Sequence, residues 1–140
     1  MRVRKGWWTM NCLSLSRRST RYPSCTWVKS KVHRGVSFGV RKMSFGLRLE
    51  IAREIHSFAQ RAEFANAGAG LVDRAESAVI AGEVDKVYLR CGLARMEGFD
   101  IDGAPADAES LFQRGPEDLA QEVLQAIKGE WGLSEEQRKN

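Results

Sequence analysis

Residues 47–65 read LRLEIAREIHSFAQRAEFA. Within this stretch, apolar residues recur at spacings of four, four, three, four and three, at Leu47, Ile51, Ile55, Phe58, Ala62 and Ala65. This spacing places them on one face of an α-helix and leaves most charged residues on the other side. Asn66, Gly68 and Gly70 follow and tolerate the backbone conformation that ends a helix. The stretch therefore predicts an amphipathic helix, around which the rest of the fold can be built.

Working outward from this helix, the pattern after Gly70 remains helical. It predicts a second helix over Leu71–Ala81, stopped by Gly82, and a third helix over Glu83–Arg95 with Gly98 as its natural stop. The run Phe99–Gly103 alternates apolar and polar residues and contains an Asp-Gly turn signal. We expect a short extended segment there, as one arm of a small hairpin.

Two further helices are predicted after this turn. Asp107 can cap a short helix over Ala108–Arg114, and Gly115 ends it. Pro116 then stands at the start of a last helix, where its missing N–H does no harm. This helix should bury four apolar residues, namely Leu119, Val123, Leu124 and Ile127.

Charge divides the chain sharply at Met43. The first 43 residues hold eleven of the 22 basic residues and none of the 18 acidic ones. Their net charge is about +11, whereas the remaining 97 residues carry about −7. Such a division indicates either a basic arm on an acidic domain or a segment outside the folded protein.

Three interpretations of segment 1–43 follow. It lacks helical period and caps over most of its length, so it is expected to be largely disordered, or a spurious extension with Met43 as the true start. Its basic residues alternate with Trp7, Trp8, Tyr22 and Trp27, which would suit an arm that binds nucleic acid. Its acid-free composition also resembles that of a targeting segment. Val36–Val40 could form a short strand, but the sequence shows no partner nearby.

The predicted fold is therefore mainly α. We expect a small bundle of four to five helices over residues 44–140, with one short extended segment near 99–103, and a largely disordered 1–43. On this interpretation Ser44–Asn140 should fold as well alone as the full chain does. No apolar stretch reaches the eighteen or so residues that a membrane helix needs.

Motifs that would carry chemistry are weak. The run Asp100-x-Asp102-Gly103 resembles the start of a calcium-binding loop. However, Ala104 and Leu111 stand where such a loop has oxygen ligands, and Pro105 stands where it has a glycine. An odd cysteine count favours a reducing compartment over a disulfide framework.

The cysteines and histidines also lack the spacing of a zinc site. The acidic part contains one cysteine, Cys91, and one histidine, His56, and neither has a possible partner ligand nearby in sequence. Cys91 lies on an expected core stripe, and His56 beside one. The sequence also has no glycine-rich phosphate loop and no serine-hydrolase or zinc-protease motif. We therefore predict a protein that is not an enzyme and holds no cofactor or metal.

With no catalytic or metal site predicted, the surface residues are the remaining candidates for function. The last third of the chain is acidic and contains Trp131 and Leu133. An acidic rim around exposed apolar residues suits the binding of a partner helix. We take five residues as candidate partner contacts, with ordinary core as the alternative: Leu47, Ile51, Ile55, Trp131 and Leu133.

Four strings carry a resemblance to a known family. They are YLRCGL at residues 88–93, EGFDIDG at 97–103, and GPEDL at 115–119, followed by the ending LSEEQRKN at 133–140. Together they resemble the tail assembly chaperones of long-tailed phages and prophages, over about residues 83–140. The resemblance does not reach segment 1–43.

If the resemblance holds, it implies a small, largely helical, non-enzymatic protein of the bacterial host cytoplasm. Members of this family bind the tape-measure protein during tail morphogenesis, help to deliver tail-tube subunits, and often exist in short and frameshift-extended forms. The rival hypothesis is a small nucleic-acid-binding protein that uses the basic, Trp- and Arg-rich N-terminal arm. No membrane partner is expected, and the oligomeric state is left open.

Overall fold

The computed structural model describes residues 19–67 and 70–132. In chain order it contains β1 (Cys25–Lys29), β2 (Ser37–Arg41), α1 (Phe45–Ala67), α2 (Leu71–Gly92), β3 (Leu93–Glu97), β4 (Asp100–Ile101), β5 (Ala104–Pro105), α3 (Ala108–Arg114) and α4 (Glu117–Glu130). The first three strands form an antiparallel sheet in the order β1-β2-β3, and β4 pairs with β5. The fold is therefore mixed α and β, and the prediction of a mainly α bundle is wrong.

The sheet shows why that prediction failed. Strand β2 lies in its centre and pairs with β3, which is more than fifty residues later in the chain. Phe38 and Val40 are buried on the inner side, while Gly39 between them faces the other side with Trp27. The partner β3 is too distant to give a local sign of pairing, but the other partner, β1, ends only eight residues before β2 begins, so the expectation that Val36–Val40 has no partner nearby is wrong.

The prediction that 1–43 is largely disordered is accordingly wrong for residues 25–41, which form β1, β2 and the loop between them. Residues 1–18, with Trp7, Trp8 and Cys12, lie outside the described part of the chain. The targeting and early-start interpretations of this segment stay predictions.

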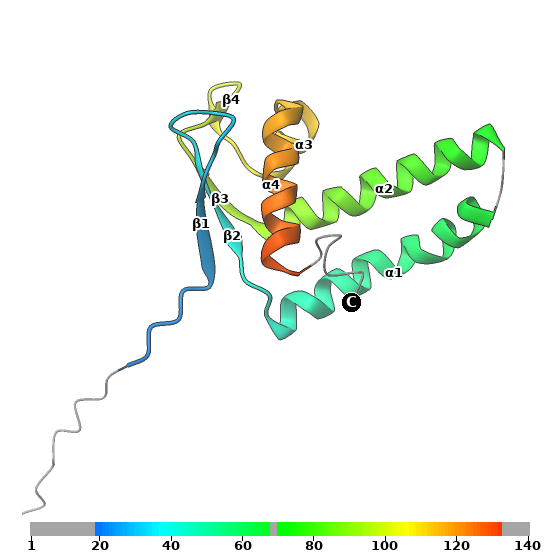
Figure 1. Cartoon of the computed structure of the whole chain (residues 1–140), viewed down its shortest axis with the longest axis horizontal. Coiled ribbons are helices and arrows are strands. Elements are labelled where there is room, and N and C mark those ends of the chain that lie inside the picture. The colour runs from blue at the N-terminus through cyan, green and yellow to red at the C-terminus, as the bar shows by residue number, and fades with distance from the viewer. Residues whose placement is uncertain (1–18, 68–69, 133–140) are drawn as a thin grey trace, which may run out of the picture.

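Helices α1 and α2 lie side by side as a long hairpin that extends away from the sheet (Figure 1). The helix predicted over 47–65 is confirmed within α1. The prediction of two helices over 71–95 is wrong, because α2 continues without a break through Gly82, the glycine that was expected to stop the first of them. A glycine inside a helix costs about 1 kcal/mol relative to alanine, which is too little to break a helix packed along its partner.

Helix α2 also ends earlier than predicted, at Gly92, and Leu93 opens β3. Gly92 allows close packing here, because a Cβ at this position would lie 2.6 Å from the Ile127 Cγ2 of α4. The chain therefore turns from helix to strand where α4 crosses it.

Local predictions after residue 98 are confirmed. The extended segment near 99–103 forms a two-stranded hairpin, with Asp102 (φ 53°) and Gly103 (φ 80°) in its turn. Asp107 caps α3 by accepting a hydrogen bond from the Ser110 N–H at 2.7 Å. The four apolar residues expected to be buried in α4 are all in the core.

The core has two connected parts. The main cluster joins the inner face of the sheet to α3, α4 and the end of α2, and includes Phe38, Leu89, Leu111, Leu119 and Ile127. A smaller cluster between α1 and α2 consists of Leu47, Ile51, Val87 and Cys91. Among the described helices, none is both long enough and apolar enough to cross a membrane.

Candidate interaction surfaces

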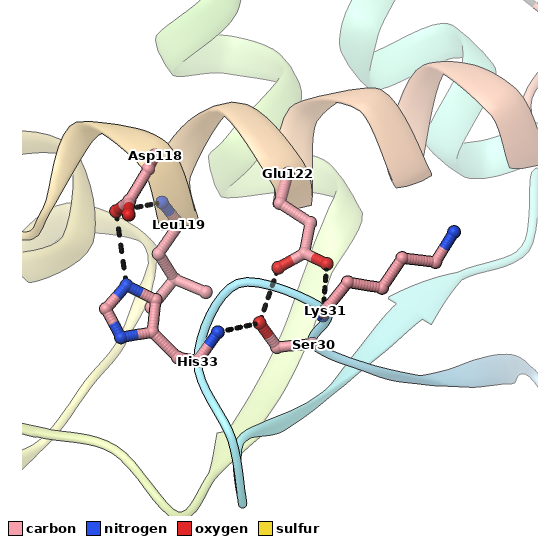
Figure 2. Close-up of polar contacts among 6 residues, drawn as sticks. All are labelled: Ser30, Lys31, His33, Asp118, Leu119 and Glu122. Atoms are coloured by element: carbon pink, nitrogen blue, oxygen red, sulfur yellow. Dashed lines mark hydrogen bonds and ion pairs between the residues drawn. The ribbon is translucent and has the colours of Figure 1, made fainter.

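The loop between β1 and β2 is fastened to α4 by hydrogen bonds to a carboxylate (Figure 2). Glu122 accepts a hydrogen bond from the Ser30 hydroxyl at 2.5 Å and another from the Lys31 backbone N–H at 2.6 Å. Burial opposes ionisation of Glu122, but these hydrogen bonds and the nearby Lys31 charge outweigh it and hold its pKa below the ordinary value. Glu122 therefore supports the loop as a carboxylate.

A second carboxylate of α4 reaches the same loop. Asp118 Oδ1 lies 3.1 Å from His33 Nε2 and also accepts a hydrogen bond from the Leu119 N–H at 2.7 Å. The contact with His33 and the Leu119 N–H lower the pKa of Asp118. We call the contacts of Ser30, Lys31 and His33 with Asp118 and Glu122 the loop clasp.

The loop clasp involves a serine, a histidine and two carboxylates, which are the residue types found in the catalytic triad of a serine hydrolase. Its geometry differs from that arrangement. His33 contacts the Ser30 hydroxyl through its backbone N–H at 2.9 Å, and Ser30 donates to Glu122. No imidazole nitrogen is placed to take the Ser30 proton, so these contacts hold the loop and do not activate a nucleophile.

The residues predicted as partner contacts lie in or against the core. Leu47 and Ile51 are buried, and Ile55 packs against the same cluster. Trp131 packs against both clusters and donates its indole N–H to the Arg41 carbonyl oxygen at 2.7 Å. Leu133 lies outside the described residues. Leu47 and Ile51 therefore belong to the core, while Ile55 and Trp131 are partly buried against it, and the role of these residues as partner contacts stays a prediction.

The candidate chemical residues are also dispersed. Cys91 is buried, which raises the pKa of its thiol, and His56 is exposed on α1. Cys25 lies at the edge of the sheet. Among residues 19–67 and 70–132, no three His, Cys, Asp or Glu side chains are grouped as a metal site would need.

A surface that the sequence analysis missed runs along the outer side of α2. Leu71, Ala75, Ala78 and Gly82 recur at spacings of four, three and four. At 3.6 residues per turn they fall within about 60° of one another around the helix. Val72 and Val79 flank them on one side. We call these six residues the α2 seam.

The α2 seam is open to solvent in the described structure. Leu71 is 84% exposed, Val72 79% and Val79 57%, and both alanines are exposed as well. Among the residues that α2 buries, Ile80, Val87 and Cys91 lie roughly 180° away around the helix, whereas Leu89, near the C-terminal end, lies on the seam side and is buried in the main cluster. Over Leu71–Gly82, helix α2 is therefore apolar on two opposite faces, of which only one is covered. The sequence contains this information as two sets of apolar residues at helical spacing, one for each face of α2.

Comparisons of the chain with protein-family models, with curated proteins and with solved structures gave no match.

Proposed function

We propose that this protein is a non-enzymatic assembly chaperone that binds an apolar helical face of a partner protein along the α2 seam. The observation that carries the proposal is the second apolar face of α2. A helix that is apolar on opposite sides is stable in water only when most of that surface is covered. Helix α1 covers one side, and a partner helix would cover the other.

The composition of the seam suits a helical partner. Spacing of four, three and four is the pattern by which two helices pack along a shared stripe. The small residues Ala75, Ala78 and Gly82 let a second backbone approach closely, and nothing lies within 4 Å of a Cβ built at Gly82. The seam spans about 16 Å along the helix, so three turns of a partner helix would cover it.

Charges border the seam on both sides and differ in sign. Arg74 lies beside Ala78, whereas Glu76 and Glu83 lie beyond the two valines. Glu76 is held by Arg61 of α1 at 3.3 Å. Opposite charges on the two borders would favour one orientation of a bound helix over its reverse.

The resemblance over residues 83–140 suggests the class of partner. Phage and prophage tape-measure proteins are very long and helical, and an assembly chaperone must cover such a chain before the tail forms. We therefore propose the tape-measure protein as the partner, in the cytoplasm of a bacterial host cell.

Co-expression of the full chain with a tape-measure protein encoded beside it tests the proposal. The chaperone should co-purify with it and reduce its aggregation, measured by light scattering. Ala75→Glu combined with Val79→Glu should abolish both effects, because glutamate preserves helix formation but charges the seam.

Ala81→Glu is the matched control, since Ala81 is also exposed on α2 but lies about a quarter turn from the seam. It should bind as the unmodified protein does. The proposal fails if the full chain neither binds nor protects the partner, or if the seam variant behaves like the control.

A further inference from the structure

The outer face of the three-stranded sheet carries an exposed aromatic platform. Trp27, Gly39 and Arg95 lie opposite one another across β1, β2 and β3. A Cβ at Gly39 would lie 3.6 Å from Trp27 Cε2, so the indole rests over the glycine. Even so, Trp27 remains 48% exposed. The helices pack on the other face, where Phe38 and Val40 are buried.

Cations surround this indole. Arg95 lies with Cζ 5.2 Å from the ring centroid of Trp27. Lys29 is two residues from Trp27 along β1 in one direction, and Arg41 is paired with Cys25, two residues in the other direction. Two strand residues span about 7 Å, so exposed basic side chains stand on both sides of the platform.

Little negative charge opposes these cations. Glu97 of β3 is the carboxylate on this face and pairs with Arg95 at 2.7 Å. Within the described residues, Lys29 and Arg41 take part in no ion pair. Their charges are therefore available to an anionic partner.

A shallow hollow of about 310 Å³ continues the basic face at its Cys25 end. Arg41, Lys42 and Tyr22 line it, and one carboxylate, Glu50, lines it as well. Lys42 Nζ is 5.1 Å from the centroid of that ring. The hollow thus repeats the combination seen at Trp27, an aromatic ring beside a cation.

We propose that the outer face of the sheet binds a single strand of nucleic acid, with an unpaired base on Trp27 and phosphates at Lys29 and Arg41. Stacking on an exposed indole needs a base that is not paired, and basic residues on both sides follow the backbone of one strand. The absence of a side chain at Gly39 leaves room for the indole to lie against the central strand. This site is independent of the α2 seam, so either proposal can fail without the other.

Binding of the full chain to a fluorescein-labelled oligodeoxythymidine of 20 nucleotides, followed by anisotropy at several salt concentrations, tests the proposal. A duplex of the same length should bind more weakly. Trp27→Ala should weaken binding to the single strand roughly tenfold or more, and Trp27→Phe should retain most of it. Lys29→Gln with Arg41→Gln should reduce the slope of log affinity against log salt by about 1.4, or about 0.7 for each lost contact.

Arg61→Gln with Arg114→Gln is the matched control, because it removes two exposed cations away from this face. Thermal unfolding checks that each variant folds. If Trp27→Ala does not fold, the double cation variant still tests the proposal, because it should lose salt dependence, and Trp27→Phe should still bind. The proposal is overturned if the oligonucleotide does not bind, or if Trp27→Ala and the double cation variant both bind like the control. Binding to phosphatidylglycerol vesicles without binding to the oligonucleotide also overturns it.

Discussion

Replacing Phe38 by alanine would test whether the basic N-terminal segment is part of the folded protein. Phe38 lies in the central strand, is 0% exposed and belongs to the main core cluster. Removing a fully buried phenylalanine costs about 3–5 kcal/mol in lost transfer energy and residual cavity. A domain of this size has roughly 5–15 kcal/mol of unfolding free energy in total. Phe38→Ala should therefore remove a large fraction of it.

Urea unfolding followed by far-ultraviolet circular dichroism measures this loss. The midpoint should fall while the slope with urea stays unchanged, because the variant exposes a similar surface on unfolding. Val32→Ala is the control, since Val32 is 49% exposed in the β1–β2 loop and should change stability by less than about 0.5 kcal/mol. A loss below about 1 kcal/mol for Phe38→Ala would refute the placement of β2 in the core.

The same reasoning applies to a chain that begins at Ser44. It would lack Val36, Phe38 and Val40, all of which are buried in the main cluster. Burial of these three side chains contributes roughly 4–9 kcal/mol. The fragment should therefore not fold cooperatively, in contrast to the expectation drawn from the charge boundary.

Two further predictions concern the contacts around α4. The pKa values of Glu122 and Asp118 are lowered by folding, so their stabilising contribution is present above the ordinary carboxyl pKa and is lost as pH falls through the folded values. Unfolding free energy should therefore decrease below about pH 4, and Glu122→Gln should flatten that decrease in urea titrations from pH 7 to pH 3. Gly92→Ala should destabilise the protein by about 1–3 kcal/mol, because the new Cβ would overlap Ile127 of α4, whereas Gly82→Ala should stabilise it by up to about 1 kcal/mol. Equal thermal midpoints for the two glycine variants would contradict the close packing of α2 on α4.

Elements that depend on neighbours in sequence could be predicted well. The cap at Asp107, the turn at Asp102 and Gly103, and the buried stripe of α4 each follow from residues within one or two turns of one another. The sheet could not be predicted in this way. Its central strand pairs with β3 across the whole α1–α2 hairpin, and the leading residues of β3 also continue the helical pattern of α2.

For a related reason, the sequence alone could not assign the candidate contact residues to the core or to a partner surface. An apolar stripe shows that a helix face must be covered, but not whether the cover comes from the same chain. Leu47 and Ile51 are covered by α2, and Trp131 by both core clusters. In contrast, Leu71 and Val79 are not covered, although their spacing is equally regular. Only the three-dimensional arrangement separates the two cases.

The charge boundary at Met43 also has a physical explanation in the structure. Part of the basic segment lies against the acidic helix α4, where His33 contacts Asp118 and Lys31 lies near Glu122. There hydrogen bonds from the loop to Glu122, with the nearby Lys31 charge, help to fasten the N-terminal strands to α4. On the other side of the sheet, Lys29 and Arg41 face solvent beside Trp27. The basic residues of the N-terminal segment therefore fall into two groups. Those in the β1–β2 loop lie against the acidic helix α4, and those on the outer face of the sheet are free to bind an anion.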